Sequence, residues 1–554
     1  MKKTYAILLS LCLMASVLAA CGGSKEAQQE GTGGNTKAGD KSPIHYTIDV
    51  LSSKETWDNN VSKKLTEQTG VSFDYVPIVG DRNQKMDLWL AGEDYPDVLY
   101  LQPRHIGKYR DAGAIIPLED LIDQYGPNIK KRFGKYYNLL KDTDGHIYSL
   151  YSPNLATETP ADVEANFIIR YDVLKEAGYP EIKTLDQLFT LIQDYYQKHP
   201  KTEDGENNIP FSGYGGSAEP DFLTNNPAFT AAGLPDHSRF LVNSDNTLSL
   251  NLVSDPMKKY TQFLNKVYNA GLLDKEFFTM NAEMSQTKLA QGAVMAGFFP
   301  AWTLGGSETA LRSSGKGDKQ YASFPLLFDE QTVDHNNTKT PTNSNNNWAI
   351  SNKAKHPERI IEFIDFLFSD EGQKLINWGV EGENYEVKDG KRVRKEDYIK
   401  KIKENPDAGV KDGPSGPYTV FSFGNGSLLD DGDYATPLTK AYIKSNYDPD
   451  TKEILAKYGK EVWADFLPPL ETVPAYLWQL NEPEEHKLEL KRIVQIYTKE
   501  VPKIIYAKNA QEFEKMWTGY TGQVDAAGRQ KVEETWTKLW KGYMDQYNQA
   551  VGTK

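Results

Sequence analysis

Residues 44–101 alternate between short apolar segments and helical patterns, and this alternation constrains the fold more than any other feature. Segments 44–51, 71–79 and 97–101 are apolar runs of strand length. Between the first two, apolar residues recur at helical spacing, and Gly70 marks a helix end. This order of strands and helices indicates a parallel sheet in an α/β protein. Because ligands bind beyond the carboxyl ends of such strands, we expect the loops after the first and third segments to face a cleft.

A second α/β unit is expected from about residue 152. Segment 167–171 is a predicted strand that leads into a short helix, and residues 184–187 (Thr-Leu-Asp-Gln) have the form of a capping box. Segment 357–378 predicts an amphipathic helix, and the patterns after residue 484 predict a helical C-terminus.

The first twenty residues have the features of a secretory signal. Lys2 and Lys3 precede the apolar run 6–17, which is too short to span a bilayer. The sequence then reads Leu-Ala-Ala-Cys and resembles the bacterial lipobox, in which the cysteine, here Cys21, is lipidated. The alternative is an ordinary signal cleaved just before Cys21. Residues 21–42 are rich in Gly, Lys, Gln and Thr, and predict a flexible linker.

Charge and cysteine content narrow the function. The net charge of −14 argues against nucleic acid as a partner, because phosphate contacts require a basic face. Cys12 leaves with the signal, so Cys21 would be the one cysteine of the mature chain, and no disulfide could form within it. We therefore expect a protein lipid-anchored, for example by palmitate, on the extracytoplasmic face of a Gram-positive cell membrane.

The search for catalytic motifs is negative. The eight histidines are scattered without an HExxH pair, and neither a G-x-S-x-G elbow nor a phosphate-binding glycine loop occurs. Paired carboxylates could support glycoside hydrolysis, but the acidic residues are too numerous for one pair to stand out. We expect a protein that is not an enzyme, has no catalytic residues and requires no cofactor.

Several segments together resemble the extracellular solute-binding proteins of family 1. They occur in the order of that family's motifs: 90–98 (LAGEDYPDV), 144–150 (DGHIYSL), 169–174 (IRYDVL), 291–295 (QGAVM), 369–373 (SDEGQ) and 379–385 (GVEGENY). The last two are typical of the large lipoprotein subgroup that includes oligosaccharide and alginate binders.

The resemblance implies a type II periplasmic-binding-protein-like fold, with two α/β lobes joined by a hinge. The expected organisation is a signal peptide (1–20), the linker (21–42), an N-terminal lobe (43–152 and about 305–370) and a C-terminal lobe (153–304 and about 371–554). It also implies a monomer that delivers an oligosaccharide, or another sugar, to the permease subunits of an ABC importer.

One departure from the family concerns calcium. Alginate-binding relatives carry a calcium loop where this chain has residues 199–210 (HPKTEDGENNIP). His199, Lys201 and Glu203 occupy its first, third and fifth positions. Calcium prefers anionic oxygen ligands, so a lysine among them is repulsive, and we expect a metal-free loop.

Sugars offer apolar C–H faces and many hydroxyls, which suit aromatic rings, carboxylates, amides and arginine. The candidate ligand-binding residues are Trp57, Tyr100, Gln102, Arg104, Trp302, Trp348, Glu381 and Tyr385. For Trp57 and Trp348 a place in the core is an equal alternative, and Glu381 and Tyr385 could instead build a structural turn. Trp378, Arg170 and the late aromatic cluster (Trp517, Tyr520, Trp536, Trp540) are expected inside the lobes.

The sequence therefore predicts a lipid-anchored receptor that captures an oligosaccharide between two lobes. Two alternatives remain open: a secreted glycosidase or polysaccharide lyase, and a sensor lipoprotein that signals to a membrane kinase.

Overall fold

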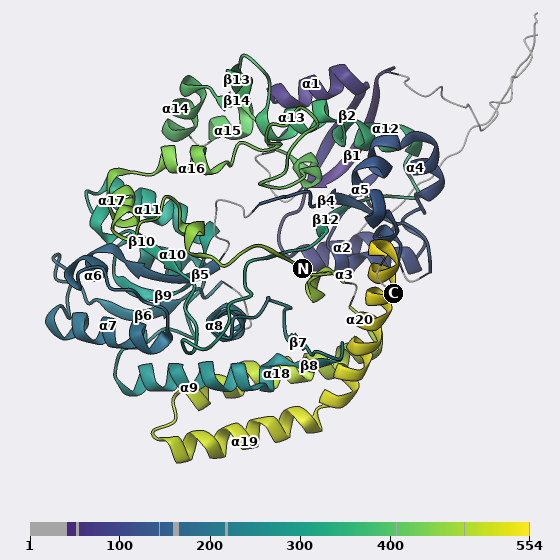
Figure 1. Ribbon diagram of the computed structural model, residues 1–554. Helices are drawn as coiled ribbons and strands as arrows, with labels where there is room; N and C mark the ends of the chain where they lie inside the picture. Colours follow the sequence, from purple (N-terminus) through teal and green to yellow (C-terminus); the bar gives the residue numbers. More distant parts are fainter. Residues whose placement is uncertain are drawn as a thin grey trace, which may run out of the picture. The chain divides into compact units, whose positions relative to one another are not determined.

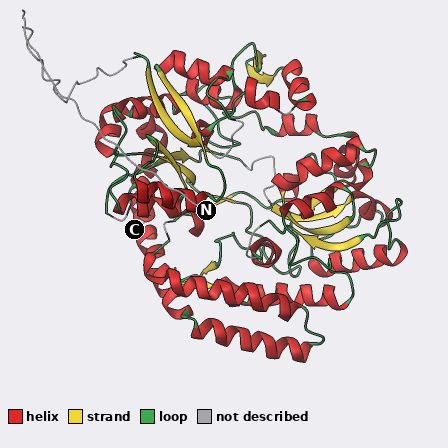
Figure 2. Cartoon of the chain, turned by 180° about the vertical axis from the view of Figure 1, so that it is seen from behind, coloured by secondary structure: helices red, strands yellow, loops and turns green. Residues whose placement is uncertain are grey.

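The described strands form two larger sheets, each flanked by helices (Figure 2), and three two-stranded sheets outside them. The structure is a computed structural model, and it describes residues 41–50, 55–142, 144–158, 165–216, 220–405, 407–480 and 482–552. The signal segment, Cys21 and most of the linker lie outside the described residues.

The first sheet has five strands in the order β2-β1-β3-β12-β4. Its parallel part is β1, β2 and β3, and the antiparallel β12 joins β3 to β4. The strands are β1 (Ile44–Val50), β2 (Val71–Pro77), β3 (Val98–Leu101), β4 (Leu150–Pro153) and β12 (Thr342–Ile350). The three strands predicted within 44–101 are thus confirmed.

Helices cover this sheet, and their ends follow from local sequence. The side chain of Asn59 accepts a hydrogen bond from the Ser62 N–H at the start of α1, and Gly70 ends that helix with φ of 75°. The predicted helix 357–378 is interrupted, because Ser369 caps a new helix, α13. The helices are α1 (Asn60–Thr69), α2 (Arg82–Gly92), α3 (Pro103–Asp111), α4 (Glu119–Tyr125), α5 (Pro127–Phe133), the 3-10 helix η1 (Gly134–Leu140), α12 (Pro357–Leu367) and α13 (Asp370–Trp378).

The second sheet has four strands in the order β10-β5-β9-β6. All seven residues of β9 are buried, as expected for a central strand covered on both faces. The strands are β5 (Ala165–Arg170), β6 (Ile209–Gly213), β9 (Val294–Pro300) and β10 (Tyr321–Phe324). β6 runs parallel to β9, and β5 runs antiparallel to it.

The helices of the second group include the predicted capping box: Thr184 and Gln187 form it at the start of α7. The C-terminus is helical, as predicted. The helices are α6 (Tyr171–Glu176), α7 (Leu185–Lys198), the π-helix η2 (Asp221–Asn225), α8 (Asn226–Ala231), α9 (Asp255–Asn269), α10 (Ala282–Ala290), η4 (Ala301–Thr303), α11 (Leu304–Ser313), α18 (Lys487–Ile505), α19 (Ala510–Ala526) and α20 (Arg529–Val551).

We call each sheet with the core packed on it a lobe, the five-stranded one being the first lobe. Its core takes in residues from Tyr46 to Tyr151, from Trp348 to Ile376 and from Tyr418 to Ala435. The lobe boundaries expected from the sequence differ from those of the structure in two places. Strand β10 pairs with β5 and so belongs to the second lobe, and segment 371–435 contributes to the first core.

The chain passes between the lobes more than once. It crosses between β4 and β5, and returns between β10 and β12. On the return, β11 (Thr338–Lys339) pairs with β15 (Glu471–Thr472) in a short parallel ribbon.

Helix α20 also contacts both lobes. Val532, Trp536 and Trp540 in its first half belong to the second core. Near its end, Tyr547 stacks on Tyr136 of η1, with ring centroids 6.4 Å apart. Figure 1 shows this helix running from α19 toward the first-lobe helices α3 and α5.

The remaining chain forms smaller elements around the two lobes. The charge-rich stretch 381–415 contains a hairpin of β13 and β14 and two short helices. These elements are β7 (Phe240–Val242), β8 (Leu248–Leu250), β13 (Tyr385–Lys388), β14 (Lys391–Arg394), α14 (Glu396–Glu404), α15 (Asp407–Asp412), η6 (Pro417–Phe421), α16 (Lys440–Asn446), α17 (Pro449–Lys457), η7 (Trp463–Phe466) and η8 (Leu477–Gln479).

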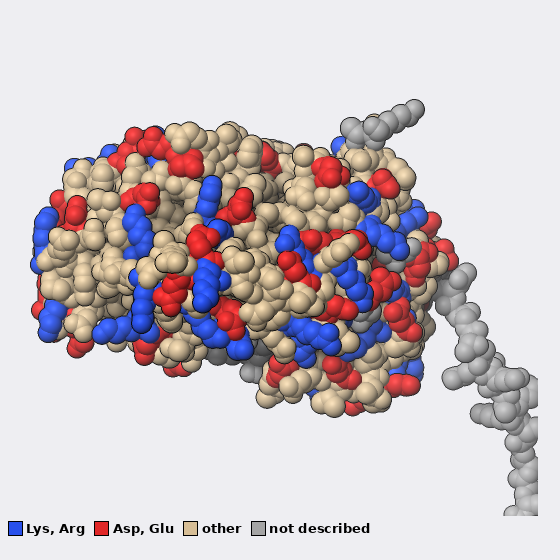
Figure 3. All heavy atoms as spheres, turned by 90° about the horizontal axis from the view of Figure 1, so that it is seen from below, with Lys and Arg blue, Asp and Glu red and all other residues tan. Residues whose placement is uncertain are grey.

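The surface carries both signs of charge. On the face shown in Figure 3, basic and acidic side chains are interspersed. Surface ion pairs such as Lys258–Glu514, with N···O of 2.8 Å, join side chains of opposite sign. Among the described residues, no helix is both long and apolar enough to cross a bilayer.

Candidate functional site

A cavity of about 460 Å³ is lined by residues of both lobes, and we call it the interlobe cavity. Its first-lobe side consists of Gln102, Pro103 and Arg104, where β3 ends and α3 begins, together with Asn346 of β12. Its second-lobe side includes Arg239, Phe240, Trp478 and Glu482. The cavity therefore lies beyond the carboxyl end of a parallel strand, where α/β sheets bind ligands, and has the size of a small-molecule site.

The exposed aromatic ring of this cavity is Trp478, which is 40% exposed, whereas Phe240 and Trp536 also line it but are buried. The Trp478 ring stacks on Tyr476, with centroids 5.1 Å apart and planes at 11°. Tyr476 is held in turn, because its hydroxyl donates to the carbonyl oxygen of Thr338 at 2.9 Å. A supported, exposed ring of this kind can stack on the apolar face of a sugar.

Polar groups surround that ring. Arg104 Nη2 donates to Gln102 Oε1 at 2.5 Å, so the amide and guanidinium are held together at the start of α3. Asn346 Oδ1 is buried and has no hydrogen-bond partner among the described residues, so it can accept from a ligand hydroxyl. Across the cavity, Arg239 Nη2 pairs with Asp221 at 2.6 Å. This set of amide, guanidinium and carboxylate groups suits a polyhydroxylated ligand.

A second aromatic surface follows the carboxyl ends of β6 and β9. Trp302 of η4 is 66% exposed and meets Phe222 of η2 edge-on, with centroids 5.9 Å apart. Phe222 in turn contacts Tyr214, which comes directly after β6. The parallel pairing of β6 and β9 brings these rings to one edge of the second sheet.

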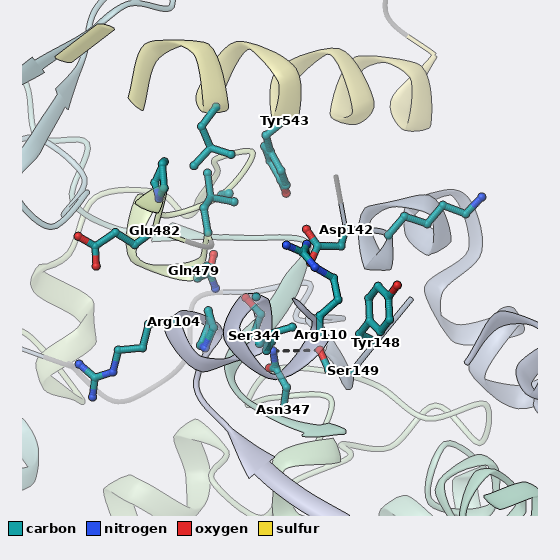
Figure 4. A pocket seen from close by; sticks show the side chains of 18 of the residues that line it. Arg104, Arg110, Asp142, Tyr148, Ser149, Ser344, Asn347, Gln479, Glu482 and Tyr543 are labelled. Atoms are coloured by element: carbon teal, nitrogen blue, oxygen red, sulfur yellow. Dashed lines mark hydrogen bonds and ion pairs between the residues drawn. The ribbon is translucent and has the colours of Figure 1, made fainter. Parts of the chain in front are cut away.

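A larger cavity of about 730 Å³ adjoins the interlobe cavity, and we call it the helix-20 cavity. The two share Pro103, Arg104, Leu480 and Glu482 in their linings. Figure 4 shows Tyr543 of α20 pointing toward a group of polar side chains on β12 and its neighbours. Within this cavity Arg110 Nη1 pairs with Asp142 at 2.7 Å.

A buried ionic group lies at the carboxyl ends of β1 and β3. Asp49 accepts a hydrogen bond from the Tyr100 N–H at 2.6 Å, and its second oxygen lies 3.4 Å from Arg82 Nη2. Complete burial raises the pKa of Asp49 to about 6, although these contacts oppose the shift. Tyr100 lies under the Arg82 guanidinium at 5.5 Å, and burial raises the pKa of its phenol to about 12.

Three candidates from the sequence have positions that suit ligand binding. Gln102 and Arg104 line the interlobe cavity, and Arg104 also lines the helix-20 cavity. Trp302 is exposed at the edge of the second sheet, although it is not among the lining residues of either cavity. Tyr100 is half-buried beneath Arg82 and lies beside the site rather than in it.

Trp348 takes the core position that was its equal alternative, and Trp57 also packs with the first core. Trp348 is fully buried, stacks on Phe363 and donates its indole N–H to the Pro417 carbonyl at 3.2 Å. The polar residues before Trp348 left its side undecided, and the inward face of β12 directs its ring into the core. Trp57 is half-buried against Phe73 and donates to Thr66 Oγ1 at 2.9 Å.

Glu381 and Tyr385 lie apart from both cavities within the described part of the chain. They form a backbone bridge with each other, and Tyr385 is 5% exposed and packs on Trp378. The structure thus places them in the turn that was their structural alternative. Trp378, Arg170 and the late aromatic cluster are buried, as expected.

Residues that the sequence analysis missed include Trp478, Phe222 and Tyr214. Trp478 lies in a segment without strand or helix periodicity, so no pattern placed it near the end of β3. The sequence around Tyr214 could have indicated a site residue, because Tyr214 follows the strand β6 and precedes two glycines.

The loop 199–210 makes its polar contacts with side chains of this chain. His199 Nε2 lies 2.6 Å from Glu176, Asp204 pairs with Lys316, and Asn208 Oδ1 accepts from Arg170 Nη1 at 2.8 Å. Across the described ranges, no three His, Cys, Asp or Glu side chains form a group suited to a metal ion.

Comparison with known proteins identifies a matching family and several relatives of the chain. A family model described as bacterial extracellular solute-binding protein matches residues 50–374. The fructooligosaccharide ABC transporter substrate-binding protein FusA of Streptococcus pneumoniae is 29% identical over 294 residues, which cover 50% of this chain and 54% of FusA. The match thus spans about half the length of that relative. Lipoprotein LipO of Bacillus subtilis is 24% identical over 401 residues, which cover 69% of this chain and 74% of LipO.

The fold is shared with solved structures. An EF-hand mutant of S. pneumoniae FusA in complex with fructo-nystose superposes with a TM-score of 0.65 at 19% identity, covering 91% of this chain and 100% of that chain. This likeness confirms the expected two-lobe α/β architecture. Because the family model matches more than half of its residues, the chain belongs to the bacterial extracellular solute-binding proteins.

Proposed function

We propose that this protein captures an oligosaccharide between its two lobes and delivers it to the permease of an ABC importer. The observation that carries the proposal is the interlobe cavity, in which an exposed ring, an amide and an arginine from different lobes face one space. Ring faces and fixed polar groups are the combination that binds sugars. The printed name of FusA, a fructooligosaccharide-binding relative, points to the same ligand class.

We also propose the manner of anchoring. The motif that ends in Cys21 would place a lipid on the mature N-terminus, and the linker would hold a monomeric body outside the membrane. LipO, a relative named as a lipoprotein, supports this placement. Replacing Cys21 by alanine should move the protein from the membrane fraction to the medium, and retention in the membrane would contradict the proposal.

A glycan panel tests binding against catalysis. The full chain, extracted in detergent, would be incubated with neutral fructo-oligosaccharides and acidic galacturonides of two to six residues. We expect an increased melting temperature with at least one sugar, because a ligand that binds only the folded state stabilises it. The sugar should be recovered intact. Release of shorter fragments would instead identify a glycosidase or lyase.

Transport and signalling need a separate test. Deleting the gene should abolish uptake of the sugar identified by the panel, and the Cys21→Ala variant should restore uptake poorly. If uptake is unaffected while a membrane kinase loses its response to the sugar, the sensor function holds and the importer function does not.

A further inference from the structure

The helix-20 cavity has a polar floor built from the first sheet. Ser344 and Asn347 of β12 and Ser149 before β4 are buried and line it, and the Asn347 amide lies 3.4 Å from Ser149 Oγ. Pairing between β12 and β4 is interrupted here, because its register shifts between Asn343 and Trp348. The interruption leaves a stretch of polar strand facing the cavity instead of a neighbouring strand.

The opposite wall is one face of α20. The lining residues of this helix recur at intervals of three and four: Thr535, Lys538, Leu539, Gly542, Tyr543 and Gln546. This spacing is one broad face of an α-helix. Val532, Trp536 and Trp540 enter the second core, and Leu539 and Tyr543 of the lining face also pack against it. The cavity thus lies between the first sheet and a helix anchored in the second lobe.

Gly542 is an exposed position on the α20 wall of the cavity. A Cβ built at this position has no atom within 4 Å. Glycine inside a helix is destabilising relative to alanine, and neither crowding nor the backbone conformation requires it here. Because Gly542 is an exposed residue on the lining face of α20, a phenylalanine there would narrow the cavity at its open margin.

The helix-20 cavity continues the interlobe cavity. The two share four lining residues, and Arg104 lies where they meet. We infer that the helix-20 cavity is a second sugar subsite, which holds the residues of an oligosaccharide that extend beyond the interlobe cavity. This inference rests on the proposed function, and it adds that longer oligosaccharides bind more tightly because they also contact β12 and α20.

Binding measured against chain length tests the inference. Isothermal titration would compare the wild type with Gly542→Phe, using fructo-oligosaccharides and galacturonides of two to six residues. We expect wild-type affinity to rise about tenfold from the shortest oligomer that binds to the longest. Gly542→Phe should bind the shortest oligomer within about twofold of wild type and lose this rise.

Gly519→Phe is the matched control, because Gly519 lies inside α19, is exposed and also has open space around a built Cβ. It should keep the wild-type length dependence. If Gly542→Phe does not fold, Lys538→Trp on the same face replaces it, since Lys538 is exposed and its side chain tolerates exchange.

The outcomes distinguish failure of the subsite from failure of the proposed function. An unchanged length dependence in a folded cavity variant overturns the subsite and leaves the proposed function standing. A wild type that binds none of these oligosaccharides overturns the proposed function, and the subsite with it.

Discussion

The indole of Trp302 meets the ring of Phe222 edge-on, with the two planes at 80°. This contact holds one side of Trp302 and leaves most of its surface exposed beyond the end of β9. The ring is therefore fixed in position without being part of either core.

Replacing Trp302 by alanine should weaken oligosaccharide binding by about 1–3 kcal/mol, the scale of a base stacked on an aromatic ring. The melting temperature should change little, because an exposed side chain contributes little to the core. Isothermal titration and a thermal melt measure both effects. Unchanged affinity would remove Trp302 from the site.

Trp348→Ala should have the opposite signature. Its ring is fully buried between Phe73, Phe363 and Phe421, so truncation should lower the free energy of unfolding by about 3–5 kcal/mol. Urea unfolding measures this loss. The affinity of the folded protein should stay near the wild-type value, and a large loss of affinity would return Trp348 to the ligand site.

Asp49 should make stability depend on pH. Its pKa of about 6 in the folded protein exceeds 3.8, the ordinary aspartate value that applies to the unfolded chain. Between these two pH values the folded state therefore holds more protons than the unfolded state. The stability contributed by this group is therefore present below about pH 4 and lost as the pH rises through 6, by about 3 kcal/mol.

The Asp49→Asn variant tests this dependence. It should match wild type near pH 4 and become the more stable protein near pH 7, as measured by urea unfolding at both values. Parallel stability profiles for the two proteins would show that Asp49 does not titrate in this range.

Calcium removal should leave the protein unchanged. Lys316 and Arg170 already contact Asp204 and Asn208 in the loop 199–210, so cationic side chains occupy the surroundings of these oxygens. The melting temperature should be equal in chelator and in millimolar calcium. One tightly held calcium ion per purified chain would contradict the prediction.

The sequence predicted local elements well where one periodicity dominates. The strands within 44–101, the capping box at Thr184 and the C-terminal helices all follow from patterns in neighbouring residues. The break at Ser369 was missed because the apolar stripe continues across it, while the serine cap acts only on the backbone of the next turn.

The site was harder to predict, since it depends on contacts between distant segments. Gln102 and Arg104 follow a strand end, which is a local signal. Trp478 reaches the same cavity through a segment nearly 400 positions later, and nothing around it indicates that approach. For Trp348 the sequence left ligand and core as equal alternatives, and the strand pleat, which depends on the register of β12, directed its ring inward.

Helix α20 has a mechanical consequence. It is embedded in the second lobe along its first half, and it reaches the first lobe where Tyr547 stacks on Tyr136. A rigid rod fixed at both ends resists rotation of one body against the other. Any rotation of one lobe against the other would therefore carry η1 along, bend the helix or separate these two rings, so the last turns of the chain would oppose it.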